Sequence, residues 1–305
     1  MMGARILRLY PGPPEDVALE GTFLAHKVHA LGSAAAPFVY ASFVSSLDGR
    51  IALQDPVTGS SHVPAGLTGG NDFRLFLELQ AQADCLITHG GYLRDIAAGQ
   101  LDDVLQIGMQ DGTRDLARWR EENGLPPQPA VVIASSSLNF PFPRSIALNV
   151  QRVLVATGAA APAEKVQALR ADGYEVIVAG KGKMVKGAPL VRELGRLGFR
   201  SLYLLAGPRM LETMLRDGML SRLYVTVTHR IFGGEHFQTM ISGPELGGAG
   251  GLRMSSLYYD ATEPEGSGQW FAQFEPLRAK QAALSGSGGS PTRCRSGRPP
   301  TADRS

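Results

Sequence analysis

Short apolar runs and helix-spaced apolar patterns alternate along most of the chain. The runs are rich in β-branched residues, as is typical of buried strands. They cover residues 38–44, 84–88, 130–134, 152–157, 174–179 and 201–205. Helical spacing of apolar residues is found over 72–82, 114–122, 162–172, 188–198 and 208–215. This alternation predicts an α/β fold on a mainly parallel twisted sheet with flanking helices.

The pattern changes after residue 220. Residues 222–228, 252–259 and 269–274 have strand character without a strong helical pattern between them, so we expect antiparallel strands at the C-terminal edge of the sheet. Prolines in the first half of residues 1–36 mark this stretch as an N-terminal arm, followed by one domain over 37–278. Residues 279–305 hold almost no apolar side chains, which predicts a disordered tail.

Charge and cysteine content limit the classes of function. The 30 Lys and Arg residues nearly balance the 28 Asp and Glu residues, so no strongly basic surface for nucleic acid or membrane is indicated. No apolar run resembles a signal peptide or is long enough to cross a bilayer. Cys85, in an apolar run, and Cys294, in a polar stretch, do not suggest a disulfide framework. We therefore expect a soluble cytoplasmic protein with a small-molecule substrate.

Four predicted strand ends carry glycine or small polar residues. They lie at 48–49, 88–91, 157–158 and 206–208. Ligands bind at such strand ends in open α/β sheets. At the last of them, Pro208 suits the first helical position, and the free N–H groups of Arg209, Met210 and Leu211 would form a phosphate or pyrophosphate site. The alternative is that Gly207 only makes a tight turn.

Other polar residues give weaker patterns. His26 and His29 have the spacing of metal ligands, but no Cys or carboxylate accompanies them, so we interpret them as core or surface histidines and predict no metal site. His89 follows a strand, and we interpret it as a solvated side chain. Asn71 or Asp72 is expected to cap the helix over 72–82. The sequence has no Walker loop, no Rossmann glycine motif and no nucleophile-elbow serine.

Several segments follow one another in a familiar order. They are FVSSLDGRIAL (43–53), TGSS (58–61), NDFRLFLELQAQADCLITHGG (71–91), RSLYLLAGPRMLETMLRDGMLSRLYVTVTHRIFGG (200–234) and MISG (240–243). Together they resemble the pyrimidine reductase domain of riboflavin biosynthesis, over about residues 37–276. The resemblance implies a dihydrofolate reductase-like fold and an NADPH-dependent oxidoreductase. The reaction it implies reduces the ribosyl chain of 5-amino-6-(5-phosphoribosylamino)uracil to ribityl. Because the sequence has no Cys-rich deaminase motif, we expect the reductase half alone.

The resemblance also assigns roles by position. The residues it places against NADPH are Val44, Thr88, Gly90, Gly91, Gly207, Pro208, Arg209, Met210 and Leu211. It places Asp48 and Ser61 on the substrate side, with Asp48 as the catalytic residue. We expect NADPH to be preferred over NADH, because Arg209, Lys181 and Lys183 could pair with a 2′-phosphate. Members of this family associate through their edge strands, so the resemblance further implies a homodimer.

Three positions depart from the family pattern. Leu205 replaces the usual Glu that ends the strand, Gln80 replaces the usual Arg in the helix, and Tyr92 interrupts the usual motif after residue 91. These changes remove charge-assisted bonds to a phosphoribosyl pyrimidine. Two alternatives therefore stay open. One is a reductase of this fold that acts on another substrate, such as a pterin or folate-like ring. The other is a non-catalytic relative that binds a nucleotide.

Overall fold

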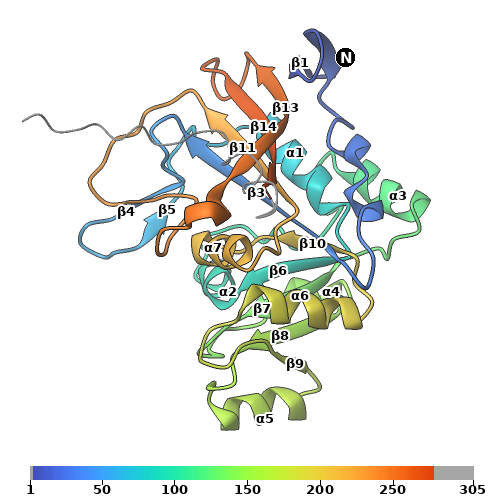
Figure 1. The fold of residues 1–305 in the computed structure, drawn as a ribbon, viewed down its shortest axis with the longest axis vertical. Helices are drawn as coiled ribbons and strands as arrows, with labels where there is room; N and C mark the ends of the chain where they lie inside the picture. Colours follow the sequence, from blue (N-terminus) through green and yellow to red (C-terminus); the bar gives the residue numbers. More distant parts are fainter. Residues whose placement is uncertain (1–2, 278–305) are drawn as a thin grey trace, which may run out of the picture.

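The computed structural model describes residues 3–277 and is built around one large twisted sheet (Figure 1). The sheet has 11 strands in the order β2-β1-β13-β14-β11-β3-β10-β6-β7-β8-β9. The strands from β11 to β9 pair in parallel, and those from β2 to β11 pair antiparallel. The mixed α/β fold with antiparallel C-terminal edge strands is thus confirmed. The expected tail, 279–305, lies outside the described residues.

The parallel strands lie close to the predicted runs. They are β3 (Phe38–Ser46), β6 (Cys85–His89), β7 (Ala130–Ala134), β8 (Val153–Thr157), β9 (Glu175–Val178), β10 (Ser201–Leu204) and β11 (Arg222–Thr228). The antiparallel strands are β1 (Arg5–Tyr10), β2 (Glu15–Ala18), β13 (Leu252–Asp260) and β14 (Gln269–Pro276). The central parallel strands are buried on both faces by helices, which explains why those runs are continuously apolar.

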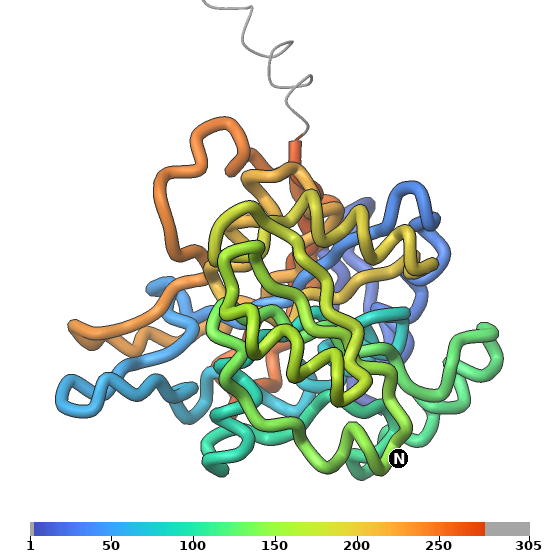
Figure 2. Tube along the Cα trace, turned by 90° about the horizontal axis from the view of Figure 1, so that it is seen from below, coloured from blue at the N-terminus to red at the C-terminus, as the bar shows by residue number. Residues whose placement is uncertain are grey.

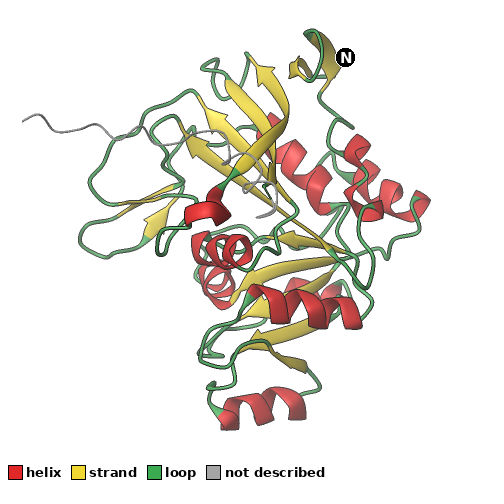
Figure 3. Ribbon diagram, in the orientation of Figure 1, coloured by secondary structure: helices red, strands yellow, loops and turns green. Residues whose placement is uncertain are grey.

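Helices cover both faces of the sheet (Figure 3). They are α1 (Gly70–Gln80), α2 (Gly90–Ala97), α3 (Arg114–Glu122), α4 (Arg144–Leu148), α5 (Ala163–Ala171), α6 (Gly187–Arg196) and α7 (Pro208–Arg216). Leu190 of α6 and Leu211 of α7 belong to the core on one face, and Leu75 of α1 and Leu93 of α2 belong to the core on the other. We call these the α7 face and the α1 face.

A second, small sheet lies beside the large one. It joins β12 (Phe237–Gln238), β4 (Ala52–Gln54) and β5 (Ser61–His62) in that order. The hairpin of β4 and β5 and the segment around β12 are far apart in sequence but run side by side (Figure 2). The segment between β4 and α1 therefore contains one short strand, β5, and the small sheet connects this segment to the loop after β11.

The expected arm covers residues 1–36, and its described part, 3–36, contributes two strands to the main sheet. β1 pairs with β13 and β2 pairs with β1. Ile6, Leu19 and Phe23 are buried in the core of the α1 face. Two short 3₁₀ turns, Leu24–His26 and Val28–Ala30, then lead to β3. Pro11, Pro13 and Pro14 lie in the turn between β1 and β2, so they remove no N–H group from the sheet.

Two expectations about helix starts are wrong. Helix α2 was not expected, because Gly90 and Gly91 were interpreted as a strand end. Glycine has low helix propensity, but His89 caps this helix and Leu93 anchors it in the core. Helix α1 begins at Gly70 with Gly69 as its cap residue, so neither Asn71 nor Asp72 caps it. The Asn71 amide instead donates to Asp260 Oδ2 over 2.9 Å.

Candidate active site

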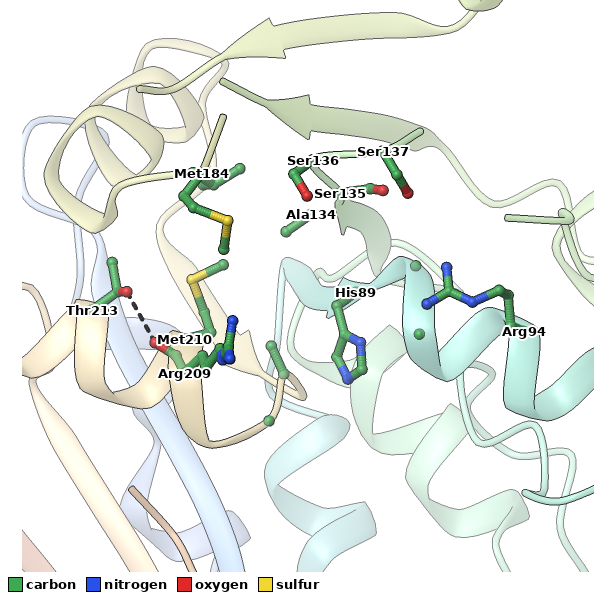
Figure 4. Close-up of a pocket in the computed structure, with 15 residues that line it drawn as sticks. His89, Arg94, Ala134, Ser135, Ser136, Ser137, Met184, Arg209, Met210 and Thr213 are labelled. Carbon is green, nitrogen blue, oxygen red and sulfur yellow. Dashed lines mark hydrogen bonds between the residues drawn. The ribbon is translucent and has the colours of Figure 1, made fainter. Parts of the chain in front are cut away.

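A cavity of about 490 Å³ opens where the carboxyl ends of β6, β7 and β10 meet (Figure 4). Its lining comes from the segments that follow these strands and from the loop after β9. The lining residues are His89, Gly90, Gly91, Arg94, Ala134, Ser135, Ser136, Ser137, Met184, Val185, Ala206, Gly207, Arg209, Met210 and Thr213. Five of the residues assigned to cofactor binding are thereby brought together: Gly90, Gly91, Gly207, Arg209 and Met210.

Two helix N-termini face this cavity. Helix α2 enters with Gly90 and Gly91, and helix α7 enters with Gly207 as its cap residue and Pro208 at its first position. The N-terminal end of a helix carries partial positive charge, and Arg94 and Arg209 add guanidinium groups on either side (Figure 4). The cavity therefore suits an anionic ligand with more than one phosphate group.

The hydrogen bonds made by the backbone N–H groups in the first turn of α7 differ from the expectation that all three are free. The N–H of Met210 and that of Leu211 both donate to the Gly207 carbonyl, at 3.0 and 3.3 Å. Among the described residues, no acceptor takes the Arg209 N–H. The anion site at this helix therefore depends on that single helical N–H and the Arg209 side chain, rather than on three N–H groups. Leu211 itself is buried in the core of the α7 face.

Gly207 adopts extended backbone geometry, with φ −66° and ψ −171°. Any residue can adopt this conformation, so the turn does not require glycine for its φ angle. A Cβ atom at this position would meet only His89 Nε2, at 3.9 Å. The open space in front of Gly207 belongs to the cavity, which agrees with close approach of a ligand to the backbone.

His89 is half-buried and has a structural bond, so its interpretation as a solvated side chain is wrong. Its Nδ1 accepts a hydrogen bond from the Tyr92 backbone N–H at 3.3 Å and so caps α2. Accepting at Nδ1 requires the neutral tautomer that carries its proton on Nε2. Burial lowers the pKa of His89, against the opposing charge of Asp95. The ring therefore presents an Nε2–H donor toward Gly207.

The serine run after β7 was not found by sequence reasoning. Ser135, Ser136 and Ser137 line the cavity opposite α7 (Figure 4). Ser135 Oγ accepts from the Leu138 N–H at 3.0 Å, and the Arg94 guanidinium donates to the Asn139 carbonyl at 2.8 Å. Three hydroxyl-bearing residues directly after a predicted strand were the available signal. Lys181 and Lys183 are exposed and do not line the cavity.

A second hollow, of about 500 Å³, lies on the other side of the start of α7. Pro208 and Arg209 line it together with Gln54 and with β12 and the residues that follow it. Ser61 is close to this region, since its Oγ accepts from Gln238 Nε2 at 2.8 Å. The two hollows share Arg209, and we refer to them together as the groove.

Both carboxylate oxygens of Asp48 have hydrogen-bond partners. Its carboxylate accepts from Ser46 Oγ at 2.5 Å and from the Gly233 N–H at 2.9 Å, and it pairs with Arg50 at 2.8 Å. Burial opposes its ionisation, but these bonds hold the pKa of Asp48 below its usual value. Arg50 in turn lies over the Phe237 ring at 4.2 Å. Asp48 thus fixes the loop after β11 against the small sheet.

Val44 and Thr88 lie in the sheet, outside both hollows. Val44 pairs with Thr226 in the register of β3 and β11. Thr88 is fully buried, and its hydroxyl has no partner among the described residues. The alternation of side chains along a strand places Val44 on the α1 face, with Tyr40, whereas Phe43 packs on the α7 face. Neither position is among the residues that line the two hollows.

The three departing positions are occupied by structural contacts. The buried Gln80 amide donates to the Val104 carbonyl. The Tyr92 hydroxyl donates to the Asp102 carbonyl at 2.8 Å and accepts from the Val104 N–H at 3.1 Å. Leu205 is half-buried and packs against the core of the α1 face. No charged side chain at these positions is available to hold a phosphate.

His26 and His29 take part in packing. His26 Nδ1 lies 3.0 Å from the Tyr224 hydroxyl, and burial lowers the pKa of His26 to about 4. His29 packs edge-on against Trp119. Within residues 3–277, no three His, Cys, Asp or Glu side chains gather as a metal site would need, and no helix has the length and apolarity needed to span a bilayer.

A mixed sheet with a cavity at the carboxyl ends of its parallel strands defines an α/β protein. The RibD C-terminal domain family matches residues 37–256, and the chain belongs to this family. The 2,5-diamino-6-ribosylamino-4(3H)-pyrimidinone 5′-phosphate reductase of Archaeoglobus fulgidus is 24% identical over 207 residues, which cover 68% of this chain and 87% of that protein. The family resemblance expected from the sequence is confirmed, and with it membership of a family of oxidoreductases.

Solved structures show the same fold. A pyrimidine reductase-like protein from Corynebacterium diphtheriae has a TM-score of 0.57 at 17% identity, covering 79% of this chain and 92% of that one. RibD of Acinetobacter baumannii has a TM-score of 0.54 at 18% identity, covering 80% of this chain and 58% of that one. The riboflavin biosynthesis reductase of Saccharomyces cerevisiae has a TM-score of 0.52 at 14% identity, covering 84% and 99%.

Proposed function

We propose that this protein is an NADPH-dependent reductase of a ribosylamino-pyrimidine. The expected reaction converts the ribosyl chain of 5-amino-6-(5-phosphoribosylamino)uracil, or of a related ring, to ribityl. The observation that carries the proposal is the groove at the carboxyl edge of the sheet, with two helix N-termini facing it, in a chain of the RibD C-terminal domain family. The pyrimidinone reductase of A. fulgidus supports the same class of substrate.

The residues of the groove fit a dinucleotide. Arg209 and its N–H, together with the Nε2–H of His89, supply donors where a pyrophosphate would lie. Ser135, Ser136, Ser137 and Arg94 offer donors at the far end, suited to a 2′-phosphate. Lys181 and Lys183 are exposed and lie outside the cavity, so we do not propose that they bind the 2′-phosphate.

The chain itself holds and orients the reactants. When bound, the cofactor supplies the hydride, and reduction of the ribosyl carbon also takes one proton. Asp48 is proposed to keep the substrate side in shape through its bonds to Ser46 and Gly233, rather than to transfer a proton, because each of its oxygens is already engaged. Ser61 and the small sheet would close the groove over the substrate.

The test is turnover by the purified full chain. NADPH oxidation is followed with the phosphoribosylamino-uracil, with its 2-amino counterpart and with dihydrofolate as separate substrates. Formation of a ribityl product with either pyrimidine supports the proposal. Reduction of dihydrofolate alone would show that the second candidate, a reductase of a pterin or folate-like ring, is correct. Gln80 and Tyr92 bond to backbone carbonyls and offer no charge to a substrate phosphate, which is the reason for keeping this candidate.

Tight NADPH binding without any turnover would support the non-catalytic alternative.

The role of Asp48 is tested with Asp48→Asn, which keeps the shape of the side chain. If Asp48 acts only through the loop after β11, this variant should lose stability as well as activity. A large loss of kcat with an unchanged melting temperature would instead make Asp48 a catalytic residue.

A further inference from the structure

Two methionines belong to the lining of the cavity at the carboxyl ends of β6, β7 and β10. Met210 comes from the first turn of α7, next to Arg209, and Met184 comes from the loop between β9 and α6. Figure 4 shows the two side chains pointing toward each other into the cavity. Two thioether groups therefore lie inside the cavity that we propose for the cofactor.

Met184 is open to solvent, unlike the other apolar residues of the lining. Its exposed fraction is 51%, whereas the neighbouring Val185 is buried. Within residues 3–277, Met109 and Met254 are also exposed, at 60% and 37%, but neither lines this cavity. Thioether groups that solvent reaches are sites of oxidation to the sulfoxide. Met184 is thus the exposed methionine of this part of the chain at which oxidation acts directly on the cavity.

Oxidation changes the hydrogen-bonding character of this side chain. A thioether has no proton to donate and accepts only weakly, so unmodified Met184 does not compete for the donors of the cavity. A sulfoxide is polar, and its oxygen is a strong acceptor with partial negative charge. Arg94 and Arg209 line the same cavity, and their guanidinium groups donate to any such acceptor within reach. Oxidised Met184 therefore opposes the binding of an anion.

We propose that Met184 is an oxidation site whose sulfoxide lowers the affinity of the cavity for phosphate-bearing ligands, NADPH among them. The oxidant is hydrogen peroxide. The Met184 sulfur forms a bond to one peroxide oxygen as the O–O bond breaks, and the other oxygen leaves with both hydrogens as water. The sulfur is oxidised by two electrons, and the peroxide is reduced. A dithiol-dependent methionine sulfoxide reductase returns the thioether, so the change is reversible.

Occupancy of the cavity controls this oxidation. A ligand that fills the cavity of about 490 Å³ covers its lining, so bound NADPH shields the Met184 sulfur from peroxide. The empty protein is the form that is oxidised. Scarcity of NADPH and an excess of peroxide then act in the same direction, since both lower the fraction of protein that can bind NADPH. This inference rests on the proposed function for its cofactor and adds a form of regulation to it.

The experiment measures oxidation and binding in the same samples. The full-length protein is treated with hydrogen peroxide, with and without NADPH, and peptide mass spectrometry gives the sulfoxide fraction at each methionine. Dissociation constants are measured before treatment and after the peroxide is removed. We expect the oxidised wild type to bind NADPH at least about tenfold more weakly, and a methionine sulfoxide reductase to restore the affinity. Bound NADPH should slow the oxidation of Met184 but not that of Met109.

Three variants assign the effect to one side chain. Met184→Leu conserves the side-chain volume and cannot be oxidised, so peroxide should change its own dissociation constant by less than about twofold. Met184→Gln places a permanent acceptor at this position and should bind NADPH weakly without treatment. Met109→Leu, at an exposed position outside the cavity, should respond to peroxide as the wild type does. An equal loss of affinity in Met184→Leu and the wild type overturns the proposal, as does oxidised Met184 with unchanged NADPH binding.

Inorganic pyrophosphate is the second probe, and it separates this proposal from the proposed function. If neither pyrimidine is reduced, the proposed function fails, yet pyrophosphate binding that is lost on oxidation of Met184 still supports the oxidation site. If the untreated protein binds neither NADPH nor pyrophosphate, the oxidation site is overturned as well. Peroxide that oxidises Met109 but leaves Met184 unmodified in the empty protein also overturns it.

Discussion

His89 and Gly207 lie next to each other in the lining of the cavity: a Cβ atom on Gly207 would lie 3.9 Å from Nε2 of His89. His89 ends β6 and Gly207 follows β10, and these two strands are parallel neighbours, so their ligand-binding ends meet at this point. The cap bond at Nδ1 sets the tautomer of His89, and the extended backbone at Gly207 leaves room for a ligand. This pair is the basis of the first two predictions.

Gly207→Asp should abolish NADPH binding while the protein stays folded. The backbone at Gly207 is extended, so the new side chain adds no strain from a positive φ. Its carboxylate would occupy the approach to α7 and repel phosphate groups, weakening NADPH at least about tenfold. Fluorescence titration measures the affinity, and circular dichroism with melting measures the fold. Gly207→Ala is the control, and its Cβ has space. A Gly207→Asp protein that melts lower but binds NADPH normally would contradict the proposed phosphate site.

His89→Ala should lose both the cap of α2 and the Nε2–H donor. Removing a helix cap costs about 1 kcal/mol, so the melting temperature should fall, and NADPH should bind more weakly. His89→Asn can keep a cap while removing the imidazole donor, so it should recover stability without recovering affinity. If the His89→Asn variant binds NADPH like the wild type, His89 only caps the helix.

The stability supplied by the His89 cap should depend on pH. Because the folded-state pKa of His89 is lowered, the neutral ring is favoured in the folded protein. The contribution is complete above the unfolded value of 6.5 and decreases as the pH falls through it. The melting temperatures of the wild type and His89→Asn should therefore match at about pH 8, and the wild type should fall below the variant on acidification. Curves that stay parallel from about pH 8 to about pH 5 would exclude this linkage.

Asp72→Asn should raise stability at neutral pH. The folded-state pKa of Asp72 is raised from 3.8 to about 6, so the carboxylic acid is the favoured form in the folded protein. Its contribution is complete below 3.8 and is lost as the pH rises through 6. At about pH 8 the variant should gain up to about 3 kcal/mol, less to the extent that water reaches this half-buried side chain. Denaturant unfolding at about pH 4 and about pH 8 measures it, and an equal difference at both would contradict the assignment.

Discrimination between NADPH and NADH should depend on Arg94 and Arg209. Both line the cavity, whereas Lys183 is exposed outside it. Substituting either arginine by Ala should reduce the preference for NADPH about tenfold, because each loses a charge-assisted bond to phosphate. Lys183→Ala should leave the ratio of the two dissociation constants unchanged. Equal constants for the two cofactors in the wild type would show that neither arginine reads a 2′-phosphate.

The sequence by itself determined the parallel strands, most of the longer helices and the class of fold. The apolar run over 201–205, its glycine and the helix over 208–215 correspond to β10 and α7 within one residue at each end. Local periodicity is enough for this, because burial on one or both faces of an element selects side chains residue by residue. The family motifs also indicated which strand ends would carry the cofactor, since the motif residues are themselves the turns after those strands.

The tertiary structure decided which groups are free to act. It showed that the N–H groups of Met210 and Leu211 are already bonded, that Ser135 completes the cavity, and that β1 extends the sheet. It also placed Asn71 of α1 beside Asp260 of β13, which are far apart in the sequence. Such pairs depend on the order of strands and the packing of helices across the sheet, and no local pattern specifies either. The availability of a hydrogen-bonding group for a ligand is a property of its partners, and only the folded chain brings those partners together.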